Sequence, residues 1–73
     1  MIDPEVQREA KRLATQVIIL KLAEPSDKYP KGRKRKDIPK ALFDAEVVRI
    51  AGDEKVIEVA KTIVRKTAPE NSN

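Results

Sequence analysis

The sequence predicts a mainly α-helical protein with a single domain, residues 1–73, and three observations lead to this fold class. Apolar residues recur at the spacing of three and four that marks one side of a helix, in three separate segments. Each segment begins near a proline or an aspartate, which favour helix starts. The segments are separated by stretches that contain proline or glycine, which interrupt regular structure.

The first helix is expected at residues 3–23. Asp3 is suited to cap its N-terminus, and Pro4 occupies the first helical position, where a missing N–H costs nothing. One stripe of this amphipathic helix is formed by Val6, Ala10, Leu13, Val17 and Leu20. The stretch TQVIILKL, residues 15–22, is rich in β-branched residues, which also suit a buried strand. The pattern therefore leaves open whether the helix continues or ends in a β segment.

A basic loop or ribbon is expected at residues 24–37, because the sequence EPSD stops any regular element. The stretch KYPKGRKRKDIPK, residues 28–40, holds seven basic residues and one acidic residue. Its net charge is +6 in a chain of net charge +4, so the other 60 residues carry −2. Positive charge concentrated on a slightly acidic body is typical of a protein that binds a polyanion. The alternatives are a solvated loop or contact with an anionic membrane or an acidic protein.

A pair of helices is expected at residues 38–68, followed by a frayed tail at residues 69–73. Pro39 opens the first helix of the pair, and Gly52 is placed to close it. Asp53 then caps the second helix, so the chain is expected to reverse direction between the two. A β-hairpin with VVRI and KVIE as its arms is the alternative, because both arms are rich in β-branched residues.

The apolar surface of this helical pair extends over more than half of each helix, which is more than two helices can hide from water. The chain has no cysteine for disulfides, and a chain of 73 residues is only marginally stable alone. We therefore expect a homodimer in which both chains contribute to one core. A monomeric three-helix bundle is the alternative fold. The predicted dimer core consists of Val17, Leu20, Leu42, Phe43, Val47, Ile50, Val56, Ile57, Ala60, Ile63 and Val64.

The basic segment predicts a protein that binds double-stranded DNA. Proteins that bind single strands stack bases on several aromatic side chains, whereas Tyr29 and Phe43 are the only aromatic residues of this chain. The predicted DNA-binding residues are Lys31, Arg33, Lys34, Arg35, Lys36 and Lys40. The guanidinium groups of Arg33 and Arg35 are suited to base edges or the minor groove, whereas the lysines are suited to neutralising phosphates.

The order of basic segment, IPKALFDAEVVRIA and DEKVIEVAKTIVRK resembles the ribbon-helix-helix family of DNA-binding proteins. The resemblance implies a homodimeric transcriptional regulator whose paired strands enter the major groove, here with an additional N-terminal helix. The strand would be either TQVIILKL or KGRKRKDI, which adjoins the helical pair. In length and composition the chain is also similar to small regulators encoded by spindle-shaped viruses of hyperthermophilic archaea. A helix-turn-helix is disfavoured, because the second helix is apolar where base edges need polar side chains.

Other classes of function follow less well from the sequence. A protein-interaction module, such as an antitoxin or adaptor, is the alternative to DNA binding. An enzyme is not expected, because the chain has no His, no Cys and no Gly-rich phosphate loop, and we expect no metal, cofactor or small-molecule substrate. The apolar run at residues 17–20 is too short to cross a bilayer, and residues 1–13 lack a signal-peptide pattern. We therefore expect no membrane partner and an intracellular, cytoplasmic location, in the host cytoplasm if the protein is viral.

Overall fold

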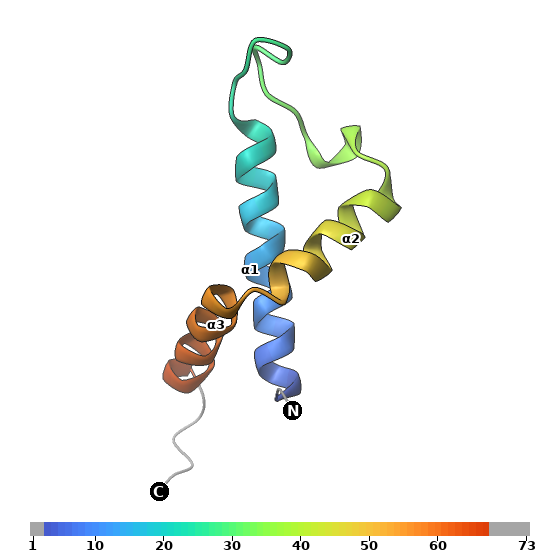
Figure 1. Cartoon of the computed structure of the whole chain (residues 1–73). Coiled ribbons are helices and arrows are strands. Elements are labelled where there is room, and N and C mark those ends of the chain that lie inside the picture. The colour runs from blue at the N-terminus through green and yellow to red at the C-terminus, as the bar shows by residue number, and fades with distance from the viewer. Residues whose placement is uncertain (1–2, 68–73) are drawn as a thin grey trace, which may run out of the picture.

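The computed structural model describes residues 3–67, which form three helices and one short turn of 3₁₀-helix (Figure 1). Helix α1 spans Pro4–Ala23, η1 spans Arg35–Asp37, α2 spans Lys40–Ala51 and α3 spans Glu54–Thr67. The prediction of a mainly α fold is confirmed. The predicted tail at residues 69–73 and the predicted helix end at residue 68 lie outside the described residues.

Helix α1 continues without a break through residues 15–22, so of the two possibilities left open for this stretch the helix is correct and the β segment is wrong. The β-branched residues are held in the helix because Ile18, together with Ala14 one turn earlier, is buried against α2. The side chain of Asp3 accepts a hydrogen bond from the backbone N–H of Glu5 at 2.8 Å and caps the start of α1. The helix ends before Pro25, which disfavours helical backbone in the residue that precedes it.

The second candidate for a strand, KGRKRKDI, is not extended throughout either. Its C-terminal half contains η1, where the backbone N–H of Asp37 donates to the carbonyl of Lys34 at 2.9 Å. The Asp37 carboxylate in turn accepts a hydrogen bond from the backbone N–H of Lys34 at 2.9 Å. A ribbon-helix-helix fold requires a strand, and residues 3–67 contain none. Only the mainly α part of the predicted fold class is therefore confirmed.

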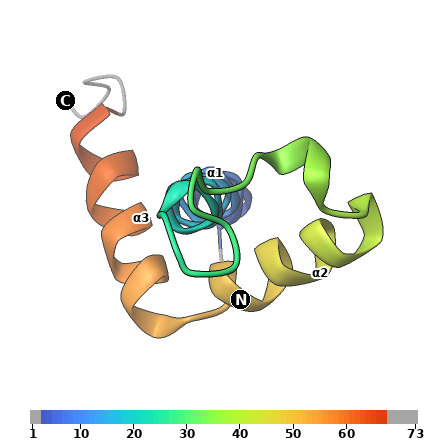
Figure 2. The same ribbon diagram turned by 90° about the horizontal axis from the view of Figure 1, so that it is seen from above.

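Helices α2 and α3 pack on α1 rather than on each other. The alternative of a β-hairpin is wrong, since both of its arms are helical, and so is the expected reversal at Gly52 and Asp53. After these two residues α3 packs across the N-terminal half of α1 (Figure 1). Viewed down α1, helices α2 and α3 lie on different sides of it (Figure 2). The α1 helix is thus the support for both.

The core consists of two clusters, one under each of these helices. In the first cluster Ala14, Ile18, Phe43 and Val47 are buried, and in the second Val6, Ala10 and Ala60 are buried. The buried alanines Ala10 and Ala60 allow α1 and α3 to approach closely. Among the residues predicted for a dimer core, the structure packs Phe43, Val47, Ile50, Val56, Ile57, Ala60 and Val64 inside the single chain.

The molecule is elongated, with extents of 53 × 20 × 19 Å. Its radius of gyration is 14.9 Å, whereas a compact chain of this length would have about 11 Å. Within residues 3–67, no helix has the length and apolar character needed to span a bilayer. The open arrangement leaves several large apolar side chains exposed, Leu20 and Leu42 among them.

Candidate nucleic-acid interface

The basic loop, defined here as residues 28–40, is attached to the end of α1 by a backbone hydrogen bond. The backbone N–H of Arg33 donates to the carbonyl of Leu22 at 2.6 Å. Just before it, Gly32 has a positive φ of 74° and closes a turn by donating to the carbonyl of Tyr29 at 2.8 Å. A Cβ atom at Gly32 would collide with the backbone carbonyl of Ala23. Only glycine therefore fits at this point, where the loop passes close to α1.

The two arginines predicted to contact DNA are both stacked on aromatic rings. The guanidinium carbon of Arg33 lies 4.4 Å from the centroid of Tyr29, and that of Arg35 lies 4.5 Å from the centroid of Phe43. A guanidinium group at this distance from the centre of a ring makes a cation–π interaction. The N–H groups at its edge remain available for hydrogen bonds. Stacking on Phe43, which is 3% exposed, connects the basic loop directly to the core under α2.

The four lysines of the predicted DNA-binding site are in two different situations. Lys31, Lys34 and Lys36 are exposed, and no ion pair joins them to a carboxylate of residues 3–67. Lys40 is also exposed, but its Nζ lies 2.6 Å from a carboxylate oxygen of Asp44 in the next turn of α2. The predicted site therefore holds five cations that a phosphate can reach directly and one that would first have to leave Asp44.

The start of α2 adds unpaired backbone donors to this charge. Pro39 is the N-cap residue of α2 and offers no side-chain hydrogen bond, and the first turn contains no acidic residue. By contrast, the carboxylate of Asp53 accepts a hydrogen bond from the backbone N–H of Lys55 at 2.8 Å at the start of α3. Free N–H groups and the helix dipole make a helix N-terminus favourable for anions. Of the N-termini of α2 and α3, only that of α2 is left open to a phosphate.

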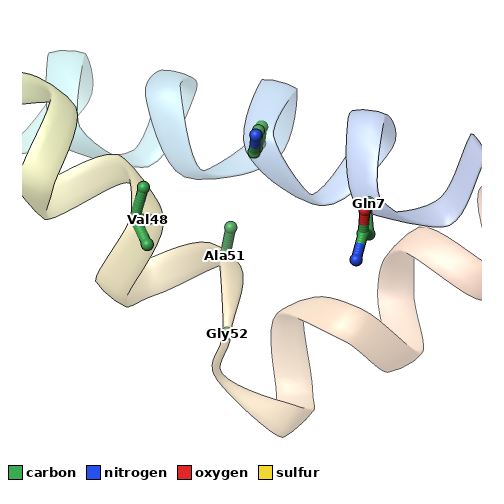
Figure 3. Close-up of a pocket in the computed structure, with 5 residues that line it drawn as sticks. Gln7, Val48, Ala51 and Gly52 are labelled. Atoms are coloured by element: carbon green, nitrogen blue, oxygen red, sulfur yellow. The ribbon is translucent and has the colours of Figure 1, made fainter. Parts of the chain in front are cut away.

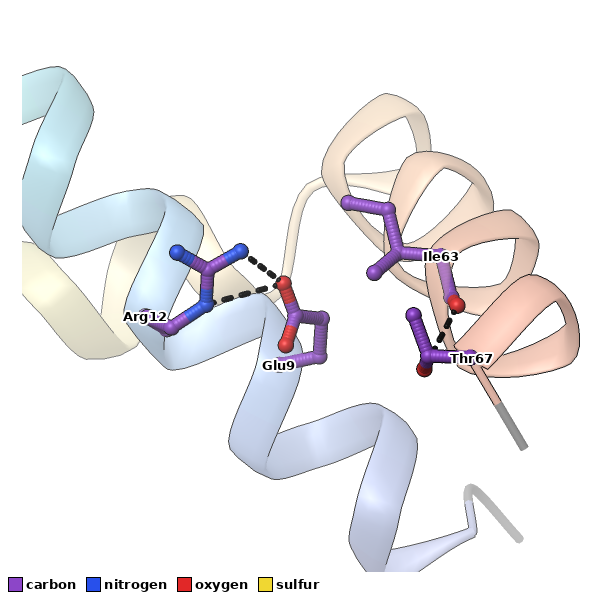
Figure 4. A network of polar contacts seen from close by, with 4 residues as sticks. All are labelled: Glu9, Arg12, Ile63 and Thr67. Atoms are coloured by element: carbon purple, nitrogen blue, oxygen red, sulfur yellow. Dashed lines mark hydrogen bonds and ion pairs between the residues drawn. The ribbon is translucent and has the colours of Figure 1, made fainter. Parts of the chain in front are cut away.

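Two arginine–carboxylate pairs account for the lowered carboxyl pKa values in the part of the chain that the structure describes. No cluster of three or more potential metal ligands occurs there. Hydrogen bonds from arginine side chains lower the pKa of two carboxyl groups, with Arg12 acting on Glu9 and Arg49 acting on Glu46. The Glu9–Arg12 pair lies on the surface of α1 near Ile63 and Thr67 of α3 (Figure 4). Both pairs are three residues apart on one helix, as is usual for surface ion pairs.

Three residues that shape the site were not predicted as part of the DNA-binding site, although Phe43 was predicted for the dimer core. Tyr29 and Phe43 support the arginines, and Asp37 fixes the turn of η1 through its bond to the Lys34 backbone. Their positions in the sequence weakly indicated this role. Both of the chain's aromatic residues lie within eight residues of an arginine of the basic loop, and Asp37 is its only acid.

Apolar surface remains exposed in two other places. The outer α2 face consists of Ala41, Leu42, Ala45 and Val48, which are all exposed and lie outside the side of α2 that carries the buried Phe43 and Val47. The α1–α3 groove is a hollow of about 220 Å³, lined by Leu13, Val17, Lys55, Val56 and Val59. Of the residues predicted for a dimer core, Val17, Leu20 and Leu42 thus stay exposed, and Ile63 is half-buried.

Comparisons with protein-family models, with curated proteins and with solved structures found no match for this chain. Its function is therefore inferred from the geometry and charge of its own residues.

Proposed function

We propose that the protein binds duplex DNA through the basic loop, as a homodimer, and acts as a transcriptional regulator or an architectural DNA-binding protein. One observation carries the proposal. Five cationic side chains of the predicted DNA-binding site, all without a carboxylate partner among residues 3–67, are gathered on a loop that is tied to α1 and to the core under α2. A loop that served only solubility would not need its arginines stacked on aromatic rings.

The chemistry of this loop suits the DNA backbone. Lys31, Lys34 and Lys36 are point charges that neutralise phosphates and release counterions. Arg33 and Arg35 are held by their stacking with their N–H edges free, so each offers two parallel donors to a phosphate or to the O6 and N7 atoms of guanine. Less side-chain entropy is lost on binding because the two guanidinium groups are already oriented.

In this proposal the loop and the start of α2 take the part that a β-ribbon has in the ribbon-helix-helix family. The uncapped N-terminus of α2 follows the basic loop directly and favours a phosphate. Once a phosphate is present, Lys40 can exchange Asp44 for it, because an exposed ion pair contributes little stability. The contact surface is thus a loop and a helix start instead of a pair of strands.

The direct test is a charge reversal that leaves the fold alone. The triple variant Lys31→Glu, Lys34→Glu, Lys36→Glu changes three exposed side chains that make no side-chain hydrogen bond within residues 3–67. The matched control, Lys61→Glu, Arg65→Glu, Lys66→Glu, makes the same change in net charge on exposed residues of α3. Fluorescence anisotropy with a labelled duplex of about two turns measures both affinities at one salt concentration.

The proposal expects the loop variant to lose at least about a hundredfold in affinity, since each phosphate contact contributes to binding through counterion release. The control should lose much less, because its charges lie on α3. Equal losses in the two variants would mean that only net charge matters, and would contradict a site in the basic loop. Circular dichroism at the same temperature confirms that both variants remain helical.

The alternative is a protein-interaction module such as an antitoxin or adaptor, and the α1–α3 groove favours it. The groove is lined mainly by apolar side chains of two helices, which is how a protein receives an amphipathic helix of a partner. A wild-type chain without affinity for duplex DNA, whose stability rises in the presence of a partner protein, would support this function instead.

A further inference from the structure

Helix α2 is apolar on two opposite sides, and α1 covers only one of them. Its inner side carries Phe43 and Val47, which are buried. Its outer α2 face carries Leu42 and Val48, which are 64% and 63% exposed, on either side of Ala45. A surface helix normally has a charged side opposite its apolar side. An exposed apolar side centred on small residues indicates that another helix packs there.

We infer that the outer α2 face binds the same face of a second copy, with the two α2 helices antiparallel about a two-fold axis that passes near Ala45. The inference rests on the proposed function because it assumes the homodimer. It adds which surface forms the dimer interface. A two-fold interface is self-complementary, so one face serves both copies.

The charges around the outer α2 face favour a second copy of this chain over a charged partner. Its flanking residues form two internal ion pairs, Lys40 with Asp44 and Arg49 with Glu46, so the helix is neutral. Two neutral faces meet without repulsion. The α1–α3 groove is less suited to self-association, because each copy would contribute Lys55 to the contact. A partner of opposite charge fits that groove better.

The side chains of the outer α2 face also suit an antiparallel pair. Ala41 and Ala45 are one turn apart, and their small size lets two helix axes approach to about 8 Å. About a two-fold axis at Ala45, residues 42 and 49 of the two copies are neighbours, as are residues 41 and 48. Leu42 therefore packs on the aliphatic stem of Arg49, and Val48 packs on Ala41, which pairs a large side chain with a small one.

The size of this interface sets how strong the dimer is. A helix of 12 residues is about 18 Å long and 10 Å wide, a footprint far below the roughly 800 Å² per partner of a standard interface. The surface continues at the end of α2 into a hollow of about 230 Å³, lined by Gln7, Lys11, Val48, Ala51 and Gly52 (Figure 3). With this addition the interface remains small, so we expect a dimer with a Kd on the order of micromolar.

The arrangement has a consequence for DNA binding. Each α2 helix begins at the basic loop, so an antiparallel pair puts the two loops at opposite ends. The two Lys40 positions lie about 15 Å apart along the helix axes, at 1.5 Å per residue from Ala45, with the rest of each loop beyond them. The dimer therefore contacts two separate stretches of one duplex.

A single cysteine tests the interface, because the chain contains none. The variant Ala45→Cys places a thiol at the two-fold axis, where the cysteines of the two copies are close enough for a disulfide. The control Val59→Cys places a thiol in the α1–α3 groove, at a residue that is 50% exposed. Both are oxidised mildly at about 100 µM protein, well above the expected Kd, and the fraction of covalent dimer is followed over time.

We expect rapid formation of a covalent dimer for Ala45→Cys and little for Val59→Cys. Faster cross-linking of Val59→Cys, or no cross-linking of either variant, would overturn the inference. Sedimentation equilibrium gives a second readout: Ala45→Glu buries a charge at the axis and should make the protein monomeric while its helicity is kept. An unchanged dimer in Ala45→Glu would also overturn it.

The inference and the proposed function fail in different ways. A dimer that cross-links through Ala45→Cys but has no affinity for duplex DNA would refute the proposed function and leave the interface intact. A chain that binds duplex DNA through its basic loop but stays monomeric at all concentrations would refute the interface alone.

Discussion

Helices α2 and α3 have similar lengths and pack on the same helix, yet they differ in almost every other respect. Helix α3 has its apolar residues on the side of α1, begins at the capping residue Asp53 and carries an acid, Glu54, in its first turn. Helix α2 is apolar on two sides, begins at the uncapped Pro39 and follows six basic residues of the segment 28–40, whose seventh, Lys40, is its first residue.

The difference indicates that the two helices have different roles. The features of α3 agree with one another and with a helix that closes a core. The features of α2 are unfavourable for an isolated chain, because they combine an open helix start, concentrated like charge and exposed apolar side chains. Local conflicts of this kind are expected where a protein binds something. The open start and the charge suit DNA, and the outer face suits a second copy.

The largest expected effect comes from the side chain that joins the two roles of α2. Phe43→Ala removes a buried ring and the surface on which Arg35 stacks, and should destabilise the fold by about 3–5 kcal/mol. The matched change on α3, Val59→Ala, concerns a half-exposed side chain and should cost less than about 1 kcal/mol. Urea unfolding measures both. Similar losses would mean that the core under α2 is no more important than the surface of α3.

A backbone change in the basic loop should come next. Gly32→Ala forces a side chain onto a backbone of positive φ and into the Ala23 carbonyl, at a cost of about 1–3 kcal/mol. The loop can escape this strain by detaching from α1, so affinity for duplex DNA should fall with stability. Gly52, which is not in the left-handed region and has room for a Cβ, is the control. Gly52→Ala should leave DNA binding unchanged. A loss of DNA affinity in this variant would contradict the expected difference between the two glycines.

Two substitutions exchange the capping of α2 and α3, so that α3 loses its N-cap and α2 gains one. Asp53→Ala removes the cap of α3 and should cost about 1 kcal/mol without weakening DNA binding. Pro39→Asp gives α2 a cap and a negative charge, which should keep stability within about 1 kcal/mol and lower DNA affinity. Thermal melts and duplex titrations of both variants test the exchange. A loss of DNA affinity in Asp53→Ala would indicate that DNA contacts the start of α3, and would contradict a contact at the start of α2.

The smallest effect concerns the surface ion pairs. Glu9 and Glu46 have pKa values below the ordinary one because of hydrogen bonds from Arg12 and Arg49. A lowered folded pKa stabilises the protein fully above the ordinary glutamate pKa of about 4.3, and the contribution is lost as the pH falls through the folded values. The free energy of unfolding should therefore decline slightly as the pH falls from 5 to below 4. The double variant Glu9→Gln, Glu46→Gln should show a smaller decline.

The helices were predictable because their signals are local. Asp3, Pro4 and Pro39 mark helix starts, and the spacing of apolar residues marks the buried sides. The strand in TQVIILKL was wrongly considered because β propensity describes half-buried surface, whereas Ile18 is held in α1 by its contacts with α2. Such contacts, and the divergence of α2 and α3 along α1, depend on packing between distant residues.

The candidate site was predictable in its charge but not in its geometry. Seven basic residues within thirteen identify the segment from the sequence alone. The stacking of Arg33 on Tyr29 and of Arg35 on Phe43, and the pairing of Lys40 with Asp44, depend on how the loop folds back. The sequence also could not divide the predicted dimer core into side chains buried within one chain and side chains left outside.

The most direct test of the central claim is the salt dependence of binding to a duplex by the wild-type protein. Five free cations in each of two copies should release about ten counterions, which gives a slope near −9 for log affinity against log salt concentration. The monomeric variant Ala45→Glu should give about half that slope. Binding without salt dependence, or a slope that the charge reversal at Lys31, Lys34 and Lys36 leaves unchanged, would contradict DNA binding by the basic loop.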